Sequence, residues 1–139
     1  MPATTDLFFD TGGLSLFLAG DPRLEPLLGQ MRGGTARGYT AMQNLIELYA
    51  KATERLGKQT AEAWYWRVLN SDVAVVDRIT PQEGIAAAQL RAKHKNLLSI
   101  VDAISMALAS SRGATLVTTD GGIRDAKEKG KVLHFAIEP

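Results

Sequence analysis

The sequence predicts an α/β domain of three layers, in which helices cover both faces of a central, mostly parallel sheet. Short apolar runs of strand length alternate along the chain with longer segments whose apolar residues recur at helical spacing. That alternation is typical of parallel sheets covered on both faces. The length of 139 residues fits one compact domain, which we expect to span residues 1–139.

The first half of the chain is expected to contribute one strand and four helices. Leu7-Phe8-Phe9 reads as a buried strand that stops at Asp10. From Tyr39 to Leu56 the apolar residues recur at helical spacing, until Gly57 ends the pattern. Shorter helices are expected over residues 14–19, 24–32 and 60–69.

The second half of the chain is expected to contribute three strands and three helices. A helix towards His94 should begin at Thr80-Pro81-Gln82-Glu83, which combines a capping hydroxyl, an early proline and a glutamate three residues after the cap. Residues 99–111 form a helix that is apolar nearly all the way round, so it should be buried. Strands are expected over residues 73–76, 115–118 and 132–137, and a short helix over 123–129.

Composition restricts the kind of site that this chain can build. The absence of cysteine excludes disulfides and thiolate metal sites, and the two histidines disfavour zinc. A bound metal should therefore be a hard cation held by carboxylate oxygens. The net charge of +1 gives no whole-molecule signature of nucleic-acid binding, so such binding would need a local patch.

The sequence favours a cytoplasmic protein without a membrane segment. The first six residues show no basic stretch ahead of an apolar core, so a signal peptide is not expected. No apolar run approaches the roughly 20 residues that a membrane-spanning helix needs.

Four acidic residues stand where they could form one site. Asp10 and Asp120 each follow a predicted strand, and in open α/β sheets ligands bind beyond the carboxyl ends of the strands. Asp102 lies in the first turn of the apolar helix, and Glu47 lies on the helix predicted from Tyr39 to Leu56. Carboxylates that converge from separate segments suit Mg²⁺ or Mn²⁺, because without a cation they would repel one another.

Each acid also has a purely structural interpretation. Asp10 could cap a helix, and Asp120 before Gly121 could be an ordinary turn aspartate. Ser99-Ile100-Val101-Asp102 has the shape of a capping box, in which the carboxylate only satisfies a helix terminus. Glu47 lies at the flank of its apolar stripe, where a solvated position is the default.

Four segments of the chain, in this order, also carry a likeness to a known family. They are Leu7-Phe8-Phe9-Asp10-Thr11, Asn44-Leu45-Ile46-Glu47-Leu48, Leu98-Ser99-Ile100-Val101-Asp102-Ala103-Ile104 and Leu116-Val117-Thr118-Thr119-Asp120. Together they resemble a PIN domain, and within that family the VapC-type toxin nucleases of toxin–antitoxin pairs. The likeness covers nearly the whole chain, and its most specific part is the serine-x-x-aspartate-alanine helix start.

The resemblance implies a ribonuclease that depends on Mg²⁺ or Mn²⁺ and hydrolyses RNA phosphodiester bonds. Its catalytic residues would be Asp10, Glu47, Asp102 and Asp120, of which the three aspartates would bind the metal. Ser99, Thr118 and Asp125 would surround and orient them. One departure is Gly12, where the family often has asparagine or serine, so a polar contact is expected to be missing or replaced by backbone.

The resemblance also implies partners. An RNA substrate needs positive charge near the acids, and Arg112, Arg124 and Lys127 are the candidates closest in sequence to Asp120. The competing interpretation is that these are ordinary surface charges. PIN-type toxins are typically homodimers neutralised by a small antitoxin, so both partners are expected here. Trp64, Tyr65 and Trp66 could stack on bases, but core or subunit packing is favoured.

Two other functions remain open at this point. A phosphoacceptor receiver domain also groups acids at strand ends, but it would need an aspartate closing a strand near Glu47 and a lysine after a late strand. A PIN fold without catalysis could serve as an RNA-binding or assembly module. A cleavage assay with and without EDTA separates that module from the enzyme.

Overall fold

The computed structural model describes residues 6–137, and it contains one five-stranded sheet in which every pairing is parallel. The strand order is β3-β2-β1-β4-β5, with β1 in the centre. The strands are β1 (Leu7–Phe9), β2 (Gly38–Ala41), β3 (Val73–Val76), β4 (Thr115–Thr118) and β5 (Val132–His134). This confirms the predicted α/β class and parallel sheet.

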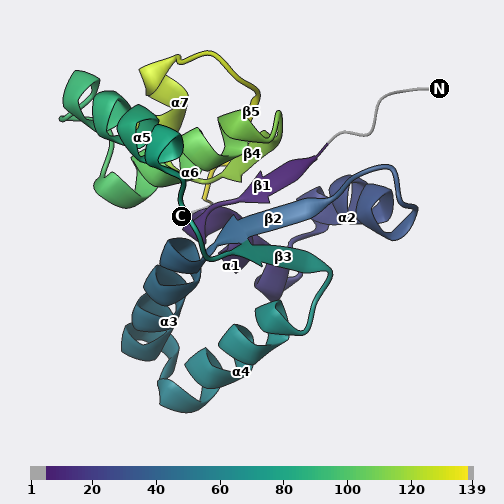
Figure 1. Ribbon diagram of the computed structural model, residues 1–139. Helices are drawn as coiled ribbons and strands as arrows, with labels where there is room; N and C mark the ends of the chain where they lie inside the picture. Colours follow the sequence, from purple (N-terminus) through teal and green to yellow (C-terminus); the bar gives the residue numbers. More distant parts are fainter. Residues whose placement is uncertain (1–5, 138–139) are drawn as a thin grey trace.

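Helices lie on both sides of the sheet, as Figure 1 shows. In that view α1, α3 and α4 lie below the sheet, whereas α5, α6 and α7 lie above it. The helices are α1 (Thr11–Ala19), a 3-10 turn η1 (Pro22–Leu24), α2 (Glu25–Arg32), α3 (Met42–Leu56), α4 (Lys58–Leu69), α5 (Pro81–Lys93), α6 (Ile100–Ser111) and α7 (Gly121–Ala126).

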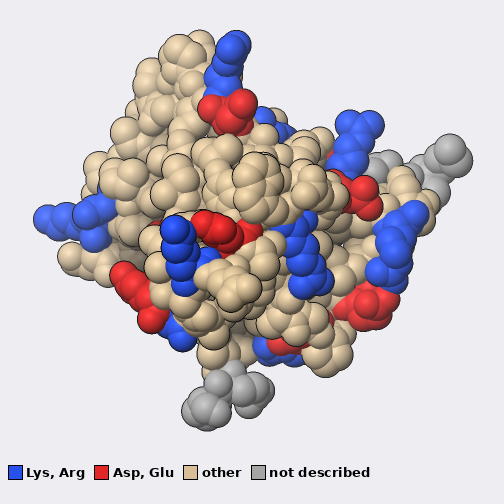
Figure 2. All heavy atoms as spheres, turned by 90° about the horizontal axis from the view of Figure 1, so that it is seen from below, with Lys and Arg blue, Asp and Glu red and all other residues tan. Residues whose placement is uncertain are grey.

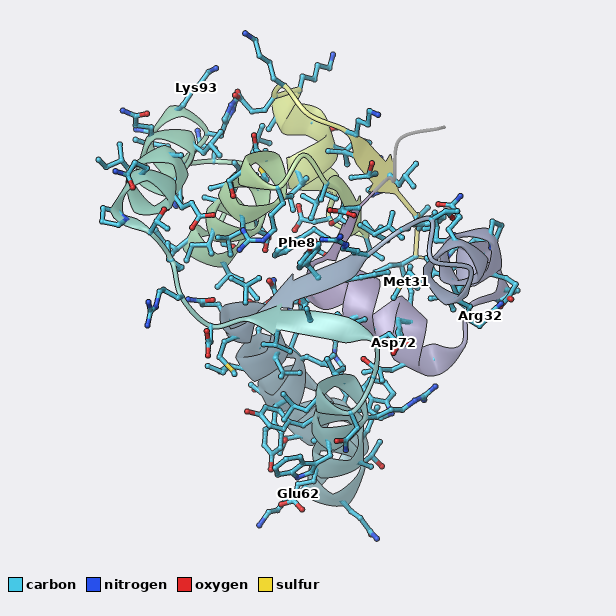
Figure 3. All side chains as sticks on the ribbon, turned by 45° about the vertical axis from the view of Figure 1, so that its right-hand side comes forward. Phe8, Met31, Arg32, Glu62, Asp72 and Lys93 are labelled. Atoms are coloured by element: carbon cyan, nitrogen blue, oxygen red, sulfur yellow. The ribbon has the colours of Figure 1, made fainter. Side chains whose placement is uncertain are left out.

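The central strand divides the core into two apolar layers, because successive strand residues point to opposite faces. Leu7 and Phe9 pack with buried residues of α1, α3 and α4, whereas Phe8 packs with those of α6 and α7. Figure 3 shows Phe8 inside the molecule, and Glu62 extending from α4 at the end farthest from the sheet. The core therefore fixes α3 and α6 separately, each in its own layer.

The prediction of helix from Tyr39 onwards was wrong for its first residues. Residues 38–41 form strand β2, which pairs with both β1 and β3. The apolar period of α3 extends backwards to Tyr39, and Ala41 offers no side-chain cap to mark the helix start. Its pairing with β1 and β3 favours the strand, and the Thr40 hydroxyl also donates to the carbonyl of Phe9 at 2.7 Å.

Other boundaries shifted by a few residues. The predicted helix over 123–129 ends at Ala126, since Lys127 adopts a left-handed backbone conformation with φ of 51°. The last strand ends at His134 rather than Ile137. Both capping boxes, at Thr80 and Ser99, are formed as predicted. Within residues 6–137 no helix is long and apolar enough to cross a membrane, and the expectation about residues 1–5 lies outside the described chain.

Candidate active site

One groove, beyond the carboxyl ends of β1 and β4, brings all four predicted acids together. It has a volume of about 590 Å³, and its lining includes Asp10, Glu47, Asp102 and Asp120. Asp10 immediately precedes α1 and Asp120 immediately precedes α7, while the other two acids lie within α3 and α6. Four elements from separate parts of the chain thus each supply one carboxylate.

Asp10 is the most buried of the four, with 4% of its surface exposed. One carboxylate oxygen accepts from the backbone N–H of Gly13 at 2.8 Å and caps α1. The other accepts a short hydrogen bond from the hydroxyl of Thr118. The same hydroxyl oxygen accepts from the N–H of Asp120 at 2.9 Å, so Thr118 joins the two aspartates that follow neighbouring strands.

Asp102 and Asp120 cap helices and line the groove at the same time. The Oδ2 atom of Asp102 accepts from the N–H of Ser99 at 3.0 Å, and the Ser99 hydroxyl accepts from the N–H of Asp102 at 3.1 Å. The Oδ1 atom of Asp120 accepts from the N–H of Ile123 at 3.0 Å. Each cap uses one carboxylate oxygen and leaves the other for a ligand. The structural interpretation and the functional one are therefore compatible.

Glu47 lies on the groove-facing side of α3, where its side chain is about one-third exposed (33%). Its Oε1 atom lies 3.5 Å from the ammonium of Lys51, one helical turn further along. A pair at this spacing on a partly exposed helix face is weak. Glu47 can therefore exchange this partner for a ligand in the groove at little cost.

Proximity and burial make these carboxylates hard to ionise together. Burial raises the pKa of Asp10 from an ordinary 3.8 to about 7, the hydrogen bonds from Thr118 and Gly13 oppose this rise, and the charges of Asp102 and Asp120 add to it. Burial also raises the pKa of Asp102, and the charges of Asp120 and Glu47 contribute. A divalent cation would relieve this repulsion.

The donor set fits a hard cation, although the carboxylates do not already enclose one. Across residues 6–137 no three acidic or histidine side chains stand together as a ready-made metal centre. The acids in the groove lining are all carboxylates, and carboxylate oxygens are the ligands that Mg²⁺ and Mn²⁺ prefer. The helix caps use one oxygen of Asp102 and one of Asp120, so the second oxygen of each carboxylate is the one that a cation would take.

Sequence comparison identifies the family. The PIN domain profile matches residues 7–129. The chain belongs to the PIN domain family. The match removes the receiver-domain alternative, and no curated protein sequence matches this PIN domain.

Solved structures share the fold of this PIN domain at low sequence identity. VapC20 of Mycobacterium tuberculosis, described as a toxin that cleaves the sarcin–ricin loop, is 24% identical with a TM-score of 0.65, over 87% of this chain and 95% of that one. DNA-bound VapBC2 of Rickettsia felis is 13% identical with a TM-score of 0.71, over 94% and 98%. DNA-bound VapBC of Salmonella typhimurium is 21% identical with a TM-score of 0.66, over 94% and 98%.

Asp125, predicted to orient the acids, and the three predicted RNA-binding residues lie outside the groove lining of this PIN domain. Asp125 is exposed and paired with Arg124 at 2.9 Å, outside the groove lining. Arg124 and Lys127 line a separate hollow of about 290 Å³ between α6, α7 and β5. Arg112 lies roughly 15 Å along α6 from Asp102, where its guanidinium bonds Glu83 at 3.1 Å and stacks over Tyr39.

The groove contains two basic residues that were not predicted from the sequence. Lys51 and Arg55 line it together with the acids. They follow Glu47 by four and eight residues, so helical spacing alone places all three on one face of α3. Sequence proximity to Asp120 had favoured Arg124 and Lys127 instead.

The structure also shows what stands beside Gly12, where the family often has asparagine or serine. A Cβ on Gly12 would lie 2.1 Å from the hydroxyl oxygen of Thr119, too close to be accommodated without movement. Both residues line the groove. The hydroxyl of Thr119 therefore occupies the space where a side chain at position 12 would begin, so a polar group stands there despite the glycine.

Proposed function

We propose that this PIN domain is a metal-dependent endoribonuclease and the toxin of a toxin–antitoxin pair. The observation that carries the proposal is the convergence of four carboxylates, from four separate elements, in one groove. Family membership and the shared fold of the VapC structures support it. The direct test is cleavage of RNA in Mg²⁺ or Mn²⁺, with and without EDTA. RNA binding without metal-dependent cleavage would favour the non-catalytic module instead.

In this proposal Asp10, Asp102 and Asp120 hold the metal, and Glu47 holds the attacking water or accepts its proton. A bound Mg²⁺ or Mn²⁺ supplies positive charge that stabilises the charge developing on the phosphate and increases the acidity of water. Thr118 fixes the orientation of Asp10 through its hydroxyl. The Ser99 cap fixes that of Asp102, so these carboxylates are held in place before substrate arrives.

In this proposal the RNA backbone contacts basic residues inside the groove, not a broad basic surface. On the face seen in Figure 2, basic and acidic side chains are interspersed, without a large field of one sign. Lys51 and Arg55, one turn apart on α3, provide local positive charge beside the acids. We propose that they bind phosphates flanking the scissile bond.

Arg55→Ala and Lys51→Ala are each expected to weaken RNA binding similarly for all sequences. Each should also lower the salt dependence of log Kd by roughly 0.7 per charge removed, the value for single strands. Binding is measured against salt in an Asp102→Asn background, so that cleavage does not interfere. Lys129→Ala, an exposed lysine outside the groove, is the matched control. An effect of Lys129→Ala as large as that of Arg55→Ala would contradict the assignment.

The apolar part of the groove supports the antitoxin half of the proposal. Beside the acids the lining becomes apolar, through Leu16, Ala19, Leu48, Ala52, Leu56, Trp64 and Ile137. Related folds were solved as toxin–antitoxin complexes, including one from Klebsiella pneumoniae. We propose that an antitoxin segment packs here. The homodimer implied by the resemblance stays a prediction, which sedimentation equilibrium can test.

Leu56→Asp is expected to weaken the complex with an antitoxin encoded beside the gene, because it places a charge in the apolar part of the groove. Leu56 is 52% exposed, so the fold should tolerate the change. RNA cleavage by the free protein should stay near the wild-type rate. Co-purification and inhibition titrations measure both effects, and an unchanged affinity would place the antitoxin elsewhere.

A further inference from the structure

A buried polar network joins the three elements that carry Asp10, Glu47 and Asp102. The side-chain amide nitrogen of Asn44 donates to the hydroxyl oxygen of Ser105 at 2.9 Å and to that of Thr11 at 3.3 Å. The Ser105 hydroxyl lies 3.1 Å from the amide oxygen of Asn44 and 3.0 Å from the carbonyl of Val101, either of which can accept its proton. Asn44 and Ser105 are almost completely buried, at 1% and 0% exposure, and Thr11 is buried at 7%.

Each member of this network belongs to an element that carries one of the acids. Thr11 follows Asp10 directly, at the start of α1. On α3, Asn44 precedes Glu47 by three residues, and on α6, Ser105 follows Asp102 by three residues. Residues three apart in a helix lie on neighbouring parts of the same face, so Asn44 and Ser105 each lie about one turn from the carboxylate on their own helix.

The apolar core holds α3 and α6 in different layers. The buried residues of α3 pack in the layer with α1 and α4, whereas those of α6 pack in the opposite layer. The two helices pack chiefly against other partners, α3 against α4 and α6 against α5. The Asn44 amide forms a polar bridge from α3 in one layer to Ser105 of α6 in the other.

An amide suits this bridge because it can donate twice and accept at the same time. Buried polar groups that lose a partner are costly, so the network tolerates only a narrow range of separations between its members. A small shift of α6 relative to α3 would break two of its hydrogen bonds. The same shift would change the distance between Asp102 and Glu47.

We propose that Asn44 is a positioning residue, whose bonds to Thr11 and Ser105 set the spacing of the elements bearing Asp10, Glu47 and Asp102. The inference rests on the proposed function, in which these carboxylates bind a divalent cation. It extends that function by assigning the affinity for the cation partly to an uncharged residue outside the groove. Asn44 acts through the carboxylates and touches neither metal nor RNA.

The test measures Mn²⁺ affinity of the full chain by calorimetry, together with unfolding by urea in the absence of metal. Asn44→Leu removes the hydrogen bonds at similar volume, and Ser105→Ala removes one hydroxyl and serves where Asn44→Leu folds poorly. Both should weaken Mn²⁺ binding by roughly 10- to 100-fold, the usual effect of removing groups that orient metal ligands. Val68→Ala is the control, because Val68 is fully buried in α4 and lies outside the groove lining.

The control separates positioning from general stability. Val68→Ala should destabilise the protein while leaving Mn²⁺ affinity within about twofold of the wild type, as expected when ligands keep their orientation. Wild-type Mn²⁺ affinity in both Asn44→Leu and Ser105→Ala would overturn the inference and leave the proposed function intact. A wild-type protein that binds no Mn²⁺ would overturn the proposed function and the inference with it.

Discussion

Asp102→Asn is expected to lower metal-dependent RNA cleavage by more than about 100-fold while leaving the fold intact. Residues that only orient a metal ligand already cost roughly 10- to 100-fold when removed, so loss of a ligand should cost more. The fold should persist because asparagine keeps an oxygen that can accept from the N–H of Ser99, as Asp102 does. Steady-state cleavage of an RNA oligonucleotide in Mn²⁺ measures the loss.

The Asp102→Asn variant should also differ from the wild type in stability. Burial and the charges of Asp120 and Glu47 raise the pKa of Asp102. Removing its charge should therefore leave the metal-free protein equally stable or more stable at neutral pH. Asp125→Asn is the matched control, since Asp125 is exposed and outside the groove, and it should cleave near the wild-type rate. Full metal-dependent cleavage by Asp102→Asn would disprove the assignment.

Ionisation of Asp10 is expected to destabilise the metal-free protein as the pH rises from about 4 to about 7. Asp10 has a pKa of about 7 in the folded chain, against an ordinary 3.8. The folded state thus holds this proton more tightly than the unfolded state does. The contribution of Asp10 to the free energy of unfolding is fully present below pH 4 and is lost as the pH rises through 7. The loss is on the order of 3–4 kcal/mol, at about 1.4 kcal/mol per pKa unit.

Asp10→Asn should remove this pH dependence and stabilise the metal-free protein at pH 8 by roughly 2–4 kcal/mol. An asparagine oxygen can still accept from the N–H of Gly13. Urea unfolding at pH 4, 6 and 8 in EDTA measures the slope. Asp72→Asn, at an exposed aspartate beside β3 (Figure 3), should leave the slope unchanged. The same change of stability with pH in the wild type and in Asp10→Asn would contradict the raised pKa of Asp10.

The same carboxylate links metal binding to protons. At pH 6 Asp10 is largely protonated, so binding of Mn²⁺ should release a proton and weaken as the pH falls. At pH 8 the cation replaces the missing proton as the partner of the buried charge. The stabilisation by Mn²⁺ should accordingly be larger at pH 8 than at pH 6.

Helices that begin with a capping motif could be predicted from the sequence, because all the residues of such a motif are close together in the chain. The capping boxes at Thr80 and Ser99 marked the starts of α5 and α6 because the partners in such a box are three residues apart. Strand β2 was missed because its hydrogen-bond partners lie more than 30 residues away, as in the bond from Thr40 to Phe9. Its own four residues look equally suited to the start of α3.

The basic residues illustrate the same limit. Arg124 and Lys127 are near Asp120 in sequence, yet they line another hollow. Lys51 and Arg55 are far from Asp120 in sequence, yet they share its groove. Their positions on α3 relative to Glu47 could have been predicted from helical spacing.

The sequence alone determined the α/β class, the placement of Asp10 and Asp120 after strands, and, through its likeness to the PIN family, the candidate role of Glu47. Those properties follow from local patterns, because periodicity, caps and strand ends depend on residues a few positions apart. Only the tertiary structure decided that the four carboxylates share a groove with Lys51 and Arg55, and that Asn44 bridges α3 and α6. The hydrogen bonds of Asn44 join residues that are 33 and 61 positions apart in the sequence. Only the packing of the two layers on one sheet brings such residues together.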